Sequence, residues 1–148
     1  MSFFNSKLRY ALCAAVDLAM QPTTVACQSR EIAFRQDIPG PYLDQILSSL
    51  KSAGIVKSVR GAGGGYNLAR QPDRIAVGDV VRAVLRTDKL FAGGENDEPP
   101  AASIAWVVRD VEQQVECTIS ELLENITLAD LVSKKTGLDD ALSYMPAL

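Results

Sequence analysis

Apolar residues recur at helical spacing along the first part of the chain and predict a long helix there. Residues 6–20 carry two adjoining stripes, one of Leu8, Leu12, Ala15, Val16 and Ala19 and one of Tyr10, Ala11, Ala14 and Leu18. Ser6 is a suitable N-cap for this helix, and Pro22 follows its end. A helix with so little polar surface is covered on two sides. We therefore expect its own domain to cover one side and something else to cover the other.

A short extended piece over residues 24–27 is expected to precede two helices joined by a tight link. Ser29 caps the first of them, over residues 30–36, and Gly40 opens the second with Pro41 at its first helical position. Gly54 is placed to end this second helix. Its side chains divide into a core-facing set of Leu43, Ile46, Leu47 and Leu50 and an outward set of Asp44, Gln45, Ser48 and Ser49. This order of elements is typical of a helix-turn-helix.

The segment VRGAGGGYNLAR, residues 59–70, has four glycines in five positions and allows two interpretations. A dinucleotide-binding loop needs a third glycine where Tyr66 stands, and a nucleotide-binding P-loop needs a lysine directly after the glycines. The segment fits neither pattern. Strand-like residues flank the glycines at positions 55–59 and 66–68. We therefore predict a β-hairpin with a glycine tip.

The first 86 residues together predict a winged helix-turn-helix. The hairpin directly follows the second helix of the pair, and an extended piece over residues 75–77 and a helix over residues 78–85 close the domain. The expected fold class is mainly α with a small β-wing. A small α+β domain of another kind is the alternative.

A second, mainly helical part is predicted beyond the wing. Residues 87–100 include GGENDEPP, which has almost nothing to bury, and are expected to form a flexible acidic loop. Residues 101–135 are expected to form a long helix and a short helix capped by Thr127, and residues 136–148 a loose tail. The long helix keeps one apolar stripe, and we expect a second copy of the chain to cover it: Ile104, Val107, Val108, Val111, Val115, Ile119 and Leu122.

Charge is divided unevenly between these two parts. The protein has 148 residues and a net charge of −3. Residues up to Arg86 include eleven Lys and Arg against six Asp and Glu, whereas residues from Thr87 onward include four against twelve. An acidic protein is a poor candidate for nucleic-acid binding, but a local excess of basic residues predicts one basic binding face.

Several classes of protein are disfavoured by what the sequence lacks. It has no histidine, which excludes Ser-His and Cys-His nucleophile activation and makes an enzyme less expected. Cys13, Cys27 and Cys117 are odd in number and have no metal-ligand spacing, so we expect packed thiols rather than disulfides or a zinc site. Asp17 interrupts the most apolar N-terminal run, so neither a signal peptide nor a membrane span is indicated. A cytoplasmic protein without a membrane partner is expected.

Four segments together resemble the Rrf2 family of bacterial transcription regulators: KLRYALCAAVDLA, REIAFRQDIPGPYLDQILSSLKSAGIVKSVRGAGGGYNLAR, IAVGDVVRAV and NITLADLV. The resemblance is strong over residues 7–84 and weaker over residues 125–132. It implies a homodimer that binds a palindromic site in double-stranded DNA. Each subunit then places a recognition helix in the major groove and a wing beside it, and the long helices cross at the dimer interface.

The resemblance also bears on cofactors. Members of the family that hold an iron-sulfur cluster carry three cysteines in the loop before the long helix, but residues 87–105 of this chain contain neither cysteine nor histidine. Thiolates are the usual ligands of such clusters. The chain therefore resembles the members without a cluster, and we expect no cofactor. A small molecule or a protein is the expected kind of effector.

Two groups of side chains are predicted to contact DNA. Phosphate contacts are expected from Lys7, Arg9, Lys57 and Arg70, with Tyr42 as a hydroxyl donor. The alternative for each of these residues is a solvated surface group without a role in binding. Base contacts are expected from Pro41, Asp44 and Gln45 at the start of the recognition helix. A carboxylate accepts from cytosine N4 and a glutamine pairs with adenine. The family places an acidic residue at the position of Asp44.

Arg60 is the strongest candidate on the hairpin. Gly63 and Gly64 lie beside it and remove side-chain bulk, so the wing can approach the duplex while the guanidinium enters a groove or binds phosphate.

Two other functions are compatible with the same fold. The recognition helix has no Lys or Arg before Lys51, which favours a dimeric module that binds protein instead of DNA. A small-molecule sensor, with its pocket between the long helix and the winged domain, is compatible with DNA binding. The main hypothesis is a DNA-binding transcriptional regulator that acts as a repressor.

Overall fold

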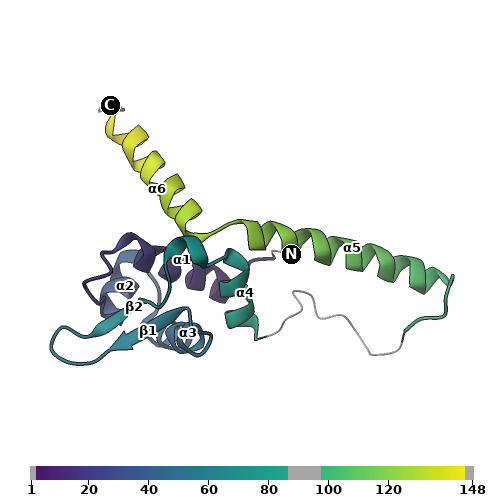
Figure 1. Cartoon of the computed structure of the whole chain (residues 1–148), viewed down its shortest axis with the longest axis horizontal. Helices are drawn as coiled ribbons and strands as arrows, with labels where there is room; N and C mark the ends of the chain where they lie inside the picture. The colour runs from purple at the N-terminus through teal and green to yellow at the C-terminus, as the bar shows by residue number, and fades with distance from the viewer. Residues whose placement is uncertain (1–2, 87–97, 146–148) are drawn as a thin grey trace.

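The computed structural model describes residues 3–86 and 98–145, and the predicted acidic loop of residues 87–100 lies mostly outside them. Six α-helices, one 3-10 helix and one hairpin follow each other in these residues (Figure 1). Their bounds are α1 Ser6–Met20, α2 Ser29–Gln36, α3 Gly40–Ser52, β1 Val56–Val59, β2 Gly65–Leu68, η1 Pro72–Arg74, α4 Val77–Leu85, α5 Ile104–Asn125 and α6 Leu128–Ser143. The order confirms the winged helix-turn-helix prediction.

Helix α1 is the centre of the winged domain. It contacts α2, α3, α4, α6 and β2, and its small residues Ala11, Ala14 and Ala15 are fully buried and allow close approach. The same core includes Leu43, Ile46, Leu47 and Leu50, the predicted core-facing set of α3. Helix α6 of the same chain also packs on α1, so part of the cover that we expected from outside the winged domain comes from this helix.

The hairpin is a two-stranded antiparallel sheet in which Val56 is opposite Leu68 and Val59 is opposite Gly65. Cys27 adds one residue of a third strand, because its N–H donates to the Tyr66 carbonyl (2.9 Å) and its carbonyl accepts from the Tyr66 N–H (2.7 Å). Gly65 makes this approach possible. Its φ is +150°, and a Cβ there would lie 2.3 Å from the Cys27 carbonyl oxygen.

Three local predictions differ from the structure. The N-cap of α1 is Asn5, whose Oδ1 accepts from the Leu8 N–H at 2.9 Å, and Ser6 is the first helical residue. The N-cap of α2 is Gln28, one residue before the predicted Ser29. Ser49 faces inward and is buried, because the core wraps further around α3 than the leucine stripe alone indicates.

Helices α5 and α6 lie partly outside the core (Figure 1). Thr127 caps α6 as predicted, with its hydroxyl accepting from the Asp130 N–H. However, α6 continues to Ser143, so the prediction of a loose tail from residue 136 is wrong for residues 136–143. Lys135 pairs with Asp139 one turn later, which supports the helix across that boundary. No helix of the described residues is long and apolar enough to cross a bilayer.

Candidate nucleic-acid interface

The N-terminal half of α3 presents polar side chains to solvent while its other face is in the core. Pro41, Asp44 and Gln45 are exposed, and Leu43 between them is fully buried. The helix start is fixed from both sides: the Pro39 carbonyl accepts from the Leu43 N–H at 3.0 Å, and Pro41 occupies the first turn. The predicted base-contacting residues therefore share one exposed helix end.

Tyr42 is held by an aromatic contact with α1. Its ring meets that of Tyr10 edge to face, with the centroids 5.6 Å apart and the planes at 84°. Such pairs are more favourable than face-to-face stacking. Tyr42 remains partly exposed, so its position beside Asp44 and Gln45 is set by the body of the domain.

An ion pair between a buried carboxylate and a partly exposed arginine fixes the helix-turn-helix to α1. Asp17 of α1 is 5% exposed, and its two carboxylate oxygens accept from Arg35 Nε (3.0 Å) and Nη2 (2.8 Å). Gln36 Nε2 donates to the same carboxylate at 2.9 Å. The hydrogen bond to Asp17 raises the pKa of the Arg35 guanidinium, which stays charged. These contacts hold the end of α2 just before the turn into α3.

The wing projects its basic residues outward. Lys57 and Arg60 are both exposed, and Arg60 directly follows β1. The tip closes through the Gly64 N–H, which donates to the Gly61 carbonyl at 2.9 Å. A Cβ on Gly64 would lie 2.5 Å from the Val59 carbonyl oxygen, whereas a Cβ on Gly63 would have no neighbour within 4 Å. Gly64 is therefore required by the turn itself, and Gly63 is free to serve close approach to a ligand.

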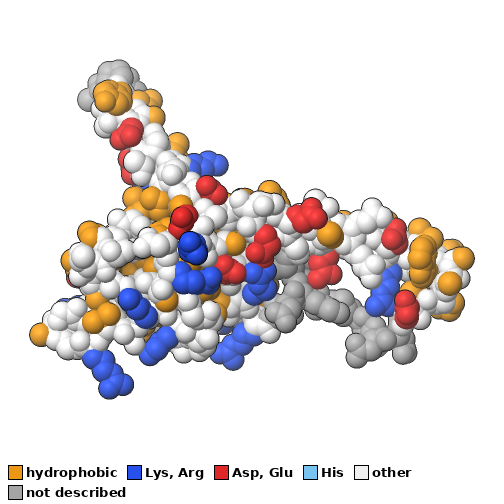
Figure 2. Space-filling view, in the orientation of Figure 1, with side chains coloured by type: hydrophobic (Ala, Val, Ile, Leu, Met, Phe, Trp, Pro, Cys, Tyr) orange, Lys and Arg blue, Asp and Glu red, His pale blue; other side chains and the backbone are white. Residues whose placement is uncertain are grey.

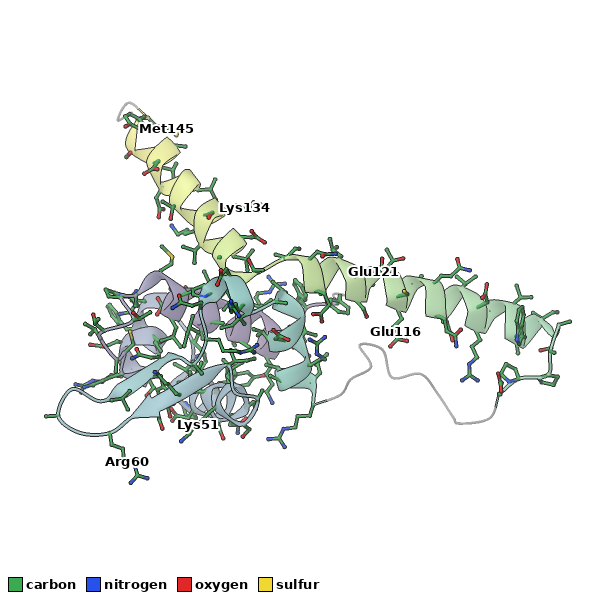
Figure 3. The ribbon with its side chains drawn as sticks, in the orientation of Figure 1. Lys51, Arg60, Glu116, Glu121, Lys134 and Met145 are labelled. Atoms are coloured by element: carbon green, nitrogen blue, oxygen red, sulfur yellow. The ribbon has the colours of Figure 1, made fainter. Side chains whose placement is uncertain are left out.

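Lys51 was not among the residues predicted to contact DNA. It lies in the last turn of α3 and is exposed. Figure 3 shows Lys51 and Arg60 on the same lower side of the molecule, and Figure 2 shows a row of basic side chains along that side. Among residues 3–86 and 98–145, no carboxylate pairs with Lys51, Lys57 or Arg60. The available signal was a basic residue directly after Leu50, in the last turn of the recognition helix.

The remaining predicted phosphate ligands lie elsewhere. Lys7 and Arg9 are in the first turn of α1, where Lys7 is half-buried and Arg9 is exposed. Arg70 follows the wing and already has partners: Nη1 donates to the Arg74 carbonyl (3.2 Å), and Nη2 lies 3.7 Å from Asp79 Oδ2. A phosphate contact by Arg70 would compete with these bonds.

The predicted dimerisation stripe lies on α5 and is largely open to solvent. Val107, Val111 and Leu122 are 54%, 55% and 58% exposed, and Ile104 is more exposed still. An open hollow of about 310 Å³ on this helix is lined by Gln114, Val115, Thr118 and Ile119. Ile119 differs from the rest because it packs against the body beside Leu8 and Val81.

Comparisons with known proteins agree with this geometry. Residues 4–134 match the model of the Rrf2 family, described as an iron-dependent transcriptional regulator. The chain is 40% identical to the HTH-type regulator slr0846 of Synechocystis over 86% of this chain and 85% of that one, and 35% identical to CymR of Bacillus subtilis over 95% and 96%. It resembles the solved structure of T. potens IscR with a TM-score of 0.70 and 36% identity, covering 98% of this chain and 93% of that one. These relatives are transcriptional regulators and not enzymes, and the chain belongs to the Rrf2 family as a DNA-binding transcriptional regulator with a winged helix-turn-helix.

Proposed function

We propose that this regulator binds a palindromic operator as a homodimer and acts as a cytoplasmic repressor. The observation that carries the proposal is the apolar stripe of α5, because six of its predicted members are exposed large hydrophobic residues: Ile104, Val107, Val108, Val111, Val115 and Leu122. A contiguous apolar face of this kind marks an interaction site. A second copy of the chain, related by a two-fold axis, covers the stripe with the same stripe of its own α5. The resulting dimer has two recognition helices.

The basic side of the domain supports the assignment of contacts. Lys51 on α3 and Lys57 and Arg60 on the wing are exposed, and we propose that they bind phosphate or a groove. Asp44 and Gln45, with Pro41 and Tyr42 beside them, are proposed to face the bases. Lys7 and Arg9 are proposed to contact the flanking backbone, and Arg70 to contact phosphate when released from Asp79.

We propose that the chain acts without an iron-sulfur cluster, although the family model is described as iron-dependent. The residues present do not suit a cluster. Cys13 and Cys117 are exposed on α1 and α5, and Cys27 is buried under the wing. Within the described residues, no three Cys, His, Asp or Glu side chains gather closely enough to hold a metal ion. The effector is proposed to be a small molecule or a protein.

Selection of bound DNA from a random pool by the purified full chain tests the operator proposal. Enriched sequences are expected to contain two inverted half-sites whose centres are about 10–10.5 base pairs or a multiple apart. Enrichment of single, asymmetric sites would contradict a two-fold complex.

Transcription in vitro from a promoter carrying the selected site is expected to fall as protein is added. A rise would make the protein an activator.

Arg60→Ala is expected to weaken operator binding about fivefold to tenfold and to lower the logarithmic salt slope by about one, because one phosphate or groove cation is lost. Fluorescence anisotropy across a salt series measures both. Lys134→Ala is the matched control, since it removes the same charge from α6, away from the side that carries Arg60 (Figure 3). Unchanged affinity in Arg60→Ala would contradict the placement of the wing.

Asp44→Ala is expected to relax the preference at one base pair by about 1–3 kcal/mol while general binding changes little, because a carboxylate accepting from cytosine specifies rather than attracts. Binding to the selected operator and to its single-base variants measures this. Ser48→Ala, one turn later on the same exposed face, serves as the control. A uniform loss across all variants would make Asp44 a residue that orients the helix.

Val111→Glu is expected to convert the dimer to a monomer and to reduce affinity for the palindrome about 100-fold, because the two half-sites are then bound independently. Light scattering and anisotropy measure the two effects. Gln113→Glu makes the same charge change on the polar side of α5 and is expected to remain dimeric. A monomeric wild-type protein would contradict the proposal at once.

A further inference from the structure

Helix α5 joins the winged domain at its C-terminal end. Leu123 is buried against Leu8, Val77 and Val81, and Ile119 and Ile126 pack at the edge of this cluster. Two backbone hydrogen bonds join the same segments. The Val77 N–H donates to the Ile126 carbonyl (2.8 Å), and the Leu128 N–H donates to the Ile75 carbonyl (2.9 Å). The first half of α5 is exposed among the described residues. In the part of the chain that the structure describes, the direction of α5 therefore depends on this joint.

A row of alternating charges lies on one side of that joint. Arg82 of α4 pairs with Glu124 of α5 and with Asp79, whose Oδ1 lies 2.8 Å from Arg82 Nη2. Asp79 Oδ2 accepts from the Ala76 N–H at the start of α4 (2.9 Å) and lies 3.7 Å from Arg70 Nη2. The row thus connects the end of the wing, α4 and α5 through Arg70, Asp79, Arg82 and Glu124.

Gly78 leaves room for the last member of the row. A Cβ at this position would lie 2.6 Å from Glu124 Oε1 and 3.3 Å from Arg82 Nη1. The carboxylate therefore occupies the space over the first turn of α4, where the positive end of a helix favours an anion. The hydrogen bond to Glu124 also raises the pKa of Arg82.

The length of α5 makes the angle at the joint important. Its 22 residues span about 33 Å, so a tilt of about 10° moves the far end by about 6 Å. Base pairs are about 3.4 Å apart along DNA, so this tilt corresponds to nearly two base pairs. In Figure 1, α3 and the wing lie on the lower side while α5 leaves sideways. In the proposed dimer, the same tilt therefore moves the two recognition helices relative to each other.

We propose that the Arg82–Glu124 pair, seated over Gly78, sets the angle between α5 and the winged domain and thereby the half-site spacing that the dimer accepts. Glu124 is a positioning residue for operator spacing. The inference rests on the proposed dimer on a palindrome. Arg82 and Glu124 are 34% and 45% exposed, so the pair is screened and contributes little to folding stability. Its effect is on geometry.

The test uses the selected operator in five versions, with the centre shortened or lengthened by zero, one or two base pairs. The full-length wild type is expected to prefer one spacing by about tenfold. Glu124→Gln is expected to reduce that preference about threefold to fivefold, a change of about 0.7–1 kcal/mol, the range of one partly exposed ion pair. Its affinity for a duplex with one half-site is expected to stay within about twofold of wild type.

A second variant and a matched control separate positioning from general damage. Gly78→Ala keeps both charges but displaces the Glu124 carboxylate, and it is expected to broaden the spacing preference in the same way. Glu121→Gln removes the same charge one turn earlier on α5. The Glu121 carboxylate accepts from the Cys117 thiol at 3.7 Å and has no described partner on the winged domain, so this variant is expected to keep the wild-type profile. Thermal unfolding checks that all three variants fold.

Each outcome decides between the two proposals. An unchanged spacing profile in both Glu124→Gln and Gly78→Ala would overturn the inference while leaving the dimer intact. Equal broadening in Glu121→Gln would assign the effect to charge alone and would also overturn it. A wild-type protein that is monomeric or accepts every spacing equally would instead reject the proposed dimer on a palindrome.

Discussion

Gly65→Ala is expected to disrupt the wing and to lower operator affinity at least about tenfold, or about 1.4 kcal/mol. A Cβ at residue 65 would lie 2.3 Å from the Cys27 carbonyl oxygen and 2.9 Å from the Gln28 nitrogen. Both neighbours are backbone atoms, so no side-chain rotation relieves the overlap. The backbone φ of +150° is also unfavourable for alanine. The two hydrogen bonds between Cys27 and Tyr66 must then break.

The cost to folding is expected to be about 2–4 kcal/mol, because two strand bonds are lost and the backbone is strained. Urea unfolding and anisotropy measure the two effects. Gly63→Ala is the matched control for stability, because its position has open space within 4 Å and no positive φ. Wild-type stability in Gly65→Ala would mean that the strand and Cys27 do not lie in contact.

Asp17→Ala is expected to destabilise the protein by about 2–4 kcal/mol and to weaken DNA binding with it. The substitution removes three hydrogen bonds at once, two from Arg35 and one from Gln36. Removing one member of a buried ion pair leaves the other uncompensated, although Arg35 is 36% exposed and recovers some hydration. The end of α2 then loses its fixed position before α3. The midpoint of urea unfolding is expected to fall, while the slope of the unfolding free energy against urea concentration stays unchanged.

Two further variants make this prediction specific. Asp17→Asn keeps one acceptor oxygen but not the charge, so it is expected to cost about half as much as the alanine variant. Asp139→Ala breaks an exposed ion pair with Lys135 on α6 and is expected to change stability by less than about 0.5 kcal/mol. A similar loss in Asp139→Ala and Asp17→Ala would show that burial of the pair is unimportant.

Sequence reasoning succeeded where a local pattern has one physical solution. The leucine and isoleucine spacing of α3 allowed one buried face, and the glycines after Val59 suited a hairpin tip better than a phosphate loop. Thr127 was predicted as a cap, and in the structure its hydroxyl accepts from the Asp130 N–H while the Asp130 carboxylate accepts from the Thr127 N–H.

Prediction from the sequence failed where two local conformations have similar energies. Asn5 and Ser6 are both good N-caps, and the choice depends on where α1 meets the body. A loose tail was expected from residue 136, yet the Lys135–Asp139 pair and the packed first turns continue α6 to Ser143. Ser49 was misjudged because the width of the buried face of α3 depends on the neighbouring helices.

The sequence by itself determined the order of the elements, the apolar stripes and the exposed polar start of α3, because these follow from residue type and the period of a helix. Only the tertiary structure revealed that α6 covers α1, that Gly65 lies on the Cys27 backbone, that Asp17 binds Arg35 and that Arg82 meets Glu124. Each of these contacts joins residues far apart in the chain. Such contacts are decided by how whole elements pack, and no local spacing encodes them.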